Sequence, residues 1–142
     1  MSPMVKILIG LIAALLIGWI WHGPLGHGAA LIDRMEGQAR TAVAATEVPG
    51  IEVHLARHPL KRIATLDGPA NDLQREGLGS QKGISDYVRA IDGIAKVRWA
   101  DEKPATAMPL LAEGLLLHVI AYLLGLGLAA IFWGRKKKEG FL

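Results

Sequence analysis

The sequence contains no cysteine among its 142 residues. This absence excludes disulfides, thiolate metal sites and a lipid-modified cysteine, and it is compatible with an oxidising compartment. Common catalytic motifs are missing as well: there is no GxSxG, no glycine-rich phosphate loop and no HExxH. We therefore expect a protein that is not an enzyme, with no catalytic residues, no bound metal and no cofactor in the leading interpretation.

Charged side chains are nearly absent from two long stretches, one near each end of the chain. Residues 7–21 (ILIGLIAALLIGWIW) carry no charge, and within residues 114–133 the only strongly polar side chain is that of His118. A helix rises about 1.5 Å per residue, so about 20 apolar residues are needed to cross a bilayer. The sequence therefore predicts transmembrane helices at residues 4–21 and 109–133.

The distribution of charge predicts the orientation of these two helices. Residues 22–108 hold 11 Lys and Arg and 11 Asp and Glu, so the net charge of +3 arises entirely from the two ends. Basic residues that flank a span stay on the cytoplasmic side. In a bacterial inner membrane, both termini, including the basic tail at 134–142, are expected in the cytoplasm and residues 22–108 in the periplasm. The residues behind this prediction are Lys6, Arg135, Lys136, Lys137 and Lys138.

The first apolar stretch is also compatible with a cleaved signal peptide. It combines a basic residue, an apolar run of 15 residues and small residues at Gly28 and Ala30 that resemble a cleavage site. However, Lys6 is its only basic residue, and the apolar run ends in the bulky Trp19 and Trp21. These features favour a retained span with an interfacial aromatic belt, and cleavage remains the alternative.

The middle of the chain alternates between helical and strand patterns. Residues 29–46 repeat apolar side chains at helical spacing, and residues 51–57 (IEVHLAR) alternate apolar and polar ones, as half-buried strands do. Residues 61–68 and 95–101 predict two further strands. Between them, Asn71 is followed three residues later by glutamine, as in the capping box that begins a helix, and several glycines then predict a kink or break.

The segments GIEVHLARHPLKRIATLDGPANDLQREGL and ISDYVRAIDGIAKVRW resemble a BON domain. The resemblance covers residues 29–101 and is carried by the order of the elements, the step LDGPANDLQRE and the close IDGIAKVRW. It implies an α+β fold, a small αββαβ domain with a three-stranded mixed sheet and two helices. BON domains occur in envelope proteins, so the resemblance implies binding to membrane, peptidoglycan or protein without catalysis. Residues 102–108 are the expected linker to the second span.

Small residues recur at helical spacing in both predicted spans. Such stripes allow two helix backbones to approach closely, so we expect a helix contact within the chain or with another protein. His118 falls on the second stripe, which predicts that it faces a helix and hydrogen-bonds to a group near that helix's outer end. The expected helix-packing residues are Gly10, Ala14, Gly18, Gly114, His118, Ala121, Gly125 and Ala129.

Two functional classes are compatible with these patterns. The first is a non-catalytic two-span membrane protein that presents a BON-like domain as a scaffold, assembly factor or accessory subunit. Its expected partners are the lipid bilayer and other membrane proteins, with a homo-oligomer left open and no nucleic acid, because the only basic run adjoins a span. The second is a cofactor-carrying membrane subunit in which His118 is the axial ligand of a chlorophyll or haem.

Overall fold

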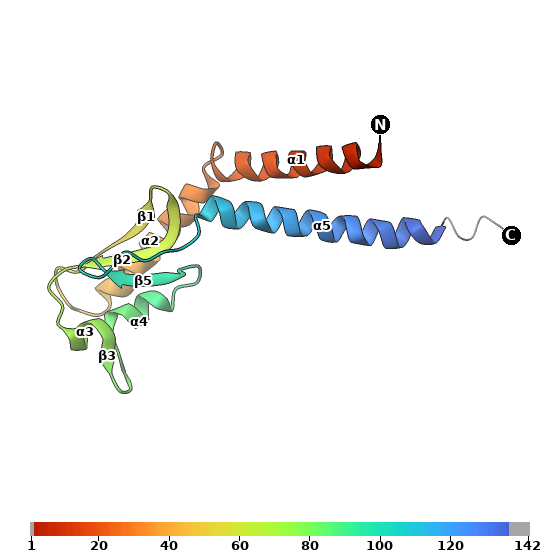
Figure 1. The fold of residues 1–142 in the computed structure, drawn as a ribbon. Coiled ribbons are helices and arrows are strands. Elements are labelled where there is room, and N and C mark those ends of the chain that lie inside the picture. Colours follow the sequence, from red (N-terminus) through yellow and green to blue (C-terminus); the bar gives the residue numbers. More distant parts are fainter. Residues whose placement is uncertain (1, 137–142) are drawn as a thin grey trace. The chain divides into compact units, whose positions relative to one another are not determined.

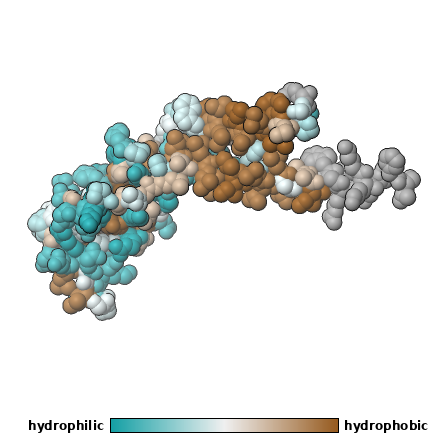
Figure 2. All heavy atoms as spheres, viewed as in Figure 1, coloured by the Kyte–Doolittle hydropathy of each residue, from teal (hydrophilic) through white to brown (hydrophobic). Residues whose placement is uncertain are grey.

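The computed structural model describes residues 2–136, which fall into two units (Figure 1). One unit is a pair of helices, α1 (Pro3–His22) and α5 (Leu110–Lys136), and it takes in the chain up to Leu25 and from Leu111 onward. Both helices are long and apolar enough to cross a membrane. Figure 2 shows the apolar spheres gathered over this helix pair. The prediction of two apolar helices of spanning length is thus confirmed.

The other unit, Gly26–Leu110, is an α+β domain. Its sheet has the order β1-β2-β5, with β1 and β2 antiparallel and β2 and β5 parallel, so the predicted three-stranded mixed sheet is confirmed. A second, two-stranded hairpin is formed by β3 and β4. The elements are α2 (His27–Ala44), β1 (Glu52–Arg57), β2 (Leu60–Asp67), α3 (Asp72–Glu76), β3 (Gly77–Leu78), β4 (Gln81–Lys82), α4 (Ile84–Arg89) and β5 (Lys96–Trp99).

The segment between β2 and β5 is where the expected second helix is interrupted. It begins as predicted, because the Asn71 side chain accepts from the Gln74 N–H (2.8 Å) and the Gln74 side chain accepts from the Asn71 N–H (3.0 Å). The helix ends at Glu76 because Gly77 adopts a φ of 75°, which side-chain-bearing residues rarely reach. The β3–β4 hairpin follows, and the chain becomes helical again in α4. The expected kink or break is therefore a complete interruption by a hairpin.

The core of the domain lies between the sheet and helices α2 and α4, which pack on the same face (Figure 1). The alternation predicted for β1 is observed, with Val53 and Leu55 buried and Glu52 and His54 exposed. Burial of such aliphatic side chains is the main source of stability, at about 1.5–3 kcal/mol each. The core residues are Ile32, Met35, Ala39, Val43, Val53, Leu55, Ala64, Leu66, Ile84, Val88, Trp99 and Leu110.

Trp99 closes this core at the end of β5. Its indole Nε1–H donates to the Ser85 hydroxyl (3.1 Å), so the buried polar atom of the ring is satisfied. The Arg75 guanidinium lies 4.3 Å from the centre of the Trp99 ring. Arg75 also donates to both carboxylate oxygens of Asp101, at 3.0 and 2.7 Å, and this bond lowers the pKa of Asp101 below its ordinary value.

Candidate functional site

The two apolar helices contact each other through a tyrosine that the sequence analysis did not single out. The Tyr122 hydroxyl of α5 donates to the backbone carbonyl of Ile7 in α1, at 2.6 Å. A Cβ atom at Gly10 would lie 2.5 Å from the Tyr122 hydroxyl oxygen, so any other residue at this position would force the hydroxyl to move. A phenol in an apolar span needs a hydrogen-bond partner. Tyr122 lies one helical turn after His118 and therefore on the same face, and this spacing was the signal in the sequence that could have identified it as a contact residue.

Gly10 and Gly18, which have no side chains, each leave a notch in the surface of α1. The Tyr122 hydroxyl lies at the notch of Gly10, and the His118 ring lies at the notch of Gly18. A Cβ atom at Gly18 would lie 3.2 Å from both Nδ1 and Cε1 of the imidazole, so the ring lies directly against this glycine. The hydrogen bond of His118 differs from the expected one, because its partner is the Gly114 carbonyl of its own helix, at 2.8 Å from Nδ1. A carbonyl oxygen only accepts, so Nδ1 carries the proton and Nε2 of a neutral ring is the acceptor.

The structure brings only some of the predicted helix-packing residues to this contact. In α1, Gly10 and Gly18 face α5, and Ala14 is half-buried between them. In α5, Ala121 is exposed, and a Cβ atom at Gly114 or Gly125 would meet nothing within 4 Å. Residues 111–114, which include Gly114, are half-buried at the start of α5. From there on the half-buried residues follow a stripe that includes two of the predicted residues, His118 and Ala129: Leu115, His118, Val119, Tyr122, Leu126 and Ala129.

Those residues behind the topology prediction that the structure describes lie near the N-terminal end of α1 and at the C-terminal end of α5. Lys6 is exposed in the first turns of α1, and Arg135 and Lys136 are the last two residues of α5. Lys137 and Lys138 fall outside the described residues. The predicted linker, residues 102–108, contains no helix or strand in the structure.

In the domain, a buried carboxylate joins α2 to the edge of the sheet. Glu36 is 4% exposed, and its Oε2 accepts from the backbone N–H of Leu55 (3.1 Å) and from Arg57 (3.1 Å). Its Oε1 accepts from Arg40. Arg57 also donates to Asp33 (2.7 Å), and this bond, with the charge of Glu36, raises the pKa of Arg57 above its ordinary value. The sequence pattern gave no sign of the contacts that join α2 to β1, because these contacts link residues 19 or more apart, whereas the Glu36–Arg40 pair is a local one, four residues apart on the helix.

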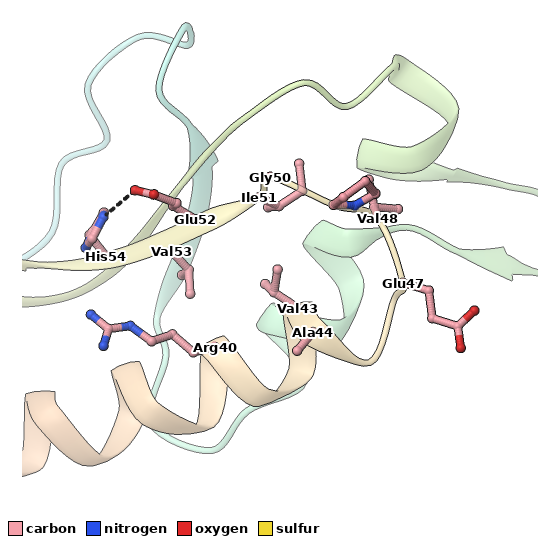
Figure 3. A pocket seen from close by; sticks show the side chains of 11 residues that line it. Arg40, Val43, Ala44, Glu47, Val48, Gly50, Ile51, Glu52, Val53 and His54 are labelled. Carbon is pink, nitrogen blue, oxygen red and sulfur yellow. Dashed lines mark hydrogen bonds and ion pairs between the residues drawn. The ribbon is translucent and has the colours of Figure 1, made fainter.

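A groove of about 630 Å³ lies beside this network, between the C-terminal half of α2 and β1 (Figure 3). Arg40, Val43 and Ala44 line it from α2, Glu52–His54 of β1 and the preceding Ile51 line it from the strand side, and residues 47–50 close its end. Arg40 and His54 are exposed at one end, where His54 contacts Glu52 (3.4 Å), and Glu47 is exposed at the other. The groove thus combines an apolar floor, a strand edge, the Arg40 guanidinium at the end that also carries Glu52, and the Glu47 carboxylate at the other end.

Within the described part of the chain, no group of three or more His, Asp or Glu residues is placed to hold a metal ion. Comparison with protein-family models, with curated proteins and with solved structures finds no match. The likeness to BON domains therefore rests on the sequence segments alone and stays a prediction. The groove in the domain and the notched helix pair are the two features from which a function can be argued.

Proposed function

We propose that this chain is a non-catalytic, two-span protein of a bacterial inner membrane that presents a BON-like binding domain in the periplasm. It would act as a scaffold, assembly factor or accessory subunit of a membrane complex. The observation that carries the proposal is an α+β domain bordered in the chain by two helices of spanning length, which contact each other through Tyr122 and His118. Such an arrangement tethers a folded domain at both of its ends.

The orientation is tested with single cysteines, because the native chain has none. Ser80 is exposed between β3 and β4, and Ser2 is exposed before α1. In intact spheroplasts, a membrane-impermeant maleimide is expected to label Ser80→Cys and to leave Ser2→Cys unlabelled until the membrane is permeabilised. The opposite pattern would reverse the topology. Loss of the Ser2→Cys site from the mature protein would instead show that the first helix is cleaved.

The binding role is tested by the size and composition of the protein in mild detergent. An affinity-tagged full-length chain is expected to purify in a stoichiometric complex with one or more membrane-associated proteins, identified by mass spectrometry after cross-linking in cells. Migration as the chain alone, with no reproducible cross-linked partner, would contradict a scaffold or accessory role. The control is a tagged chain of the same length in which exposed Gln38 is replaced by Arg.

A second candidate function rests on His118. Because Nδ1–H is held by the Gly114 carbonyl, Nε2 is the nitrogen left to ligate a chlorophyll or haem. A visible spectrum of the purified protein distinguishes this candidate from the first. A Soret or chlorophyll band that disappears in His118→Ala would favour the cofactor-carrying subunit, whereas a colourless protein in a stable complex would favour the scaffold.

A further inference from the structure

The outer edge of β1 borders the groove beside α2. The sheet order β1-β2-β5 makes β1 an edge strand. The Leu55 N–H donates to Glu36 and so points away from β2. Residues two apart on a strand direct their peptide groups to the same side, so the N–H and carbonyl of Val53 also point to the outer edge. An edge of this kind is a template for a further strand.

Glu36 closes this edge at one point only. Its carboxylate occupies the position that an added strand would need beside Leu55, and both arginines hold it there. An added strand can therefore pair with Val53 and Ile51, whereas its residue opposite Leu55 cannot hydrogen-bond there and has to turn away from the edge, on the side of Arg40. From Gly50 to His54 the accessible edge is about 13 Å long, at about 3.3 Å per residue, which suits a segment of about five residues.

The charges along the groove predict which end of that segment is acidic and which is basic. Arg40, whose side chain is 61% exposed, lies at the Leu55 end, and the exposed Glu47 lies at the opposite end. Arg40 uses a single terminal nitrogen in its bond to Glu36, so its other N–H groups are able to receive a carboxylate. Between the two charges, Val43 and Ile51 offer an apolar surface for one aliphatic side chain.

We propose that this groove binds an extended segment of a partner polypeptide, which adds a strand antiparallel to β1. The segment places an aliphatic residue over Val43, an acidic residue near Arg40 and a basic residue near Glu47. In the antiparallel direction the acidic residue comes first in the sequence. Main-chain hydrogen bonds supply affinity in such strand addition, and the side chains supply selectivity. This inference rests on the proposed function, since it names the surface and the class of partner of the same domain.

Two peptides of identical composition test the direction of binding. The probes are acetylated and amidated Asp-Thr-Val-Thr-Lys and Lys-Thr-Val-Thr-Asp, titrated into the full-length protein in detergent micelles. Binding is followed by peptide fluorescence anisotropy and by the amide resonance of Val53. The first peptide is expected to bind severalfold more tightly and to shift the Val53 amide. Failure of both to bind at about 1 mM, or equal binding of the two, would overturn the proposal.

Backbone methylation tests whether the contact is strand pairing. With the central valine of the peptide opposite Val53, the N–H of that valine points to β1 and the N–H of each neighbouring threonine points away. N-methylation of the central valine is therefore expected to abolish binding, and N-methylation of the following threonine to leave it nearly unchanged. Equal effects of the two modifications would exclude strand addition, because both peptides have the same added methyl group.

A pair of arginine substitutions on α2 tests whether the peptide binds in the groove. Ala44→Arg fills the groove from an exposed position of α2, and the matched Gln38→Arg adds the same charge to the same helix outside it. Ala44→Arg is expected to weaken peptide binding about tenfold or more, whereas Gln38→Arg is not. If Ala44→Arg binds the peptide normally, the groove is not the site. If this variant also retains the partners found by cross-linking, the proposed function stands while this inference falls.

Discussion

Replacing Glu36 by alanine is expected to be among the most destabilising single substitutions on the surface between α2 and β1. The substitution removes the only acceptor that the structure gives to the Leu55 N–H. Leu55 and Glu36 are each 4% exposed, so water does not readily replace the lost carboxylate. It also removes one partner from Arg40 and one from Arg57. Arg57 keeps its bond to Asp33 at 2.7 Å, so only part of the network is lost.

The magnitude is dominated by the buried amide. A buried donor that loses a charged acceptor costs about 1.5–3 kcal/mol. The side chains of Arg40 and Arg57 are 61% and 43% exposed, so solvent already screens their ion pairs, and together these pairs add about 0–1 kcal/mol. The expected loss in the free energy of unfolding is therefore about 1.5–4 kcal/mol. Glu36→Gln keeps an acceptor oxygen for Leu55 and is expected to cost about 1 kcal/mol.

The assay is urea unfolding of the full-length protein in detergent, in a chain whose other tryptophans are replaced by phenylalanine so that Trp99 reports on the core. For Glu36→Ala the midpoint is expected to fall by about 1–3 M, with an unchanged slope. Glu52→Ala is the control, because it removes a glutamate whose side chain is 76% exposed on the neighbouring strand. A Glu36→Ala midpoint within error of the Glu52→Ala midpoint would refute the reasoning.

Two further predictions concern the helix contact and the pKa of a carboxyl group. Gly10→Leu is expected to displace the Tyr122 hydroxyl and increase amide hydrogen exchange in α1, whereas Gly125→Leu, where a Cβ atom meets nothing within 4 Å, is not. Equal exchange in both variants would contradict the notch. For Asp101, carboxyl NMR is expected to give a pKa below 3.8 that returns toward that value in Arg75→Met. Because the folded-state pKa is depressed, the bond stabilises the domain above the unfolded-state pKa, and this contribution is lost as pH falls through the folded-state pKa. An unchanged pKa in Arg75→Met would contradict this assignment.

Most of the domain's secondary structure could be predicted because its signals are local. The alternation in IEVHLAR fixed the buried face of β1, and Asn71 marked the beginning of α3 through its side-chain cap. The edge groove and the Glu36 network could not be predicted in the same way. They depend on where α2 lies against β1, and the Glu36–Leu55 contact joins residues 19 apart. Hydrophobic periodicity says which face is buried but not which peptide groups a distant side chain will reach.

The contact face of α5 was harder to predict for a different reason. In a span, large and small apolar side chains are equally compatible with lipid, so polarity does not reveal which side of the helix meets another helix. The sequence analysis chose the stripe Gly114, His118, Ala121, Gly125 and Ala129, of which His118 and Ala129 are half-buried in the structure while Ala121 and Gly125 are exposed. The structure instead turns the large stripe that includes Tyr122 toward the glycines of α1, about 70° around the helix at about 100° per residue. Small residues on one helix accept large residues from the other.

This arrangement bears on which functional proposal the chain favours. The polar side chains of His118 and Tyr122 each bond to a backbone carbonyl inside the helix pair, at 2.8 and 2.6 Å. The His118 Nδ1–H and the Tyr122 hydroxyl therefore have hydrogen-bond acceptors within the helix pair and need no cofactor or partner protein to supply one. The glycine notches give a sufficient physical reason for both residues to face inward. The groove beside β1 has no such internal purpose, since a closed edge would stabilise the domain better than one that ends at Glu36. Together these two observations favour the proposal in which the domain binds a partner and the helices serve as anchors.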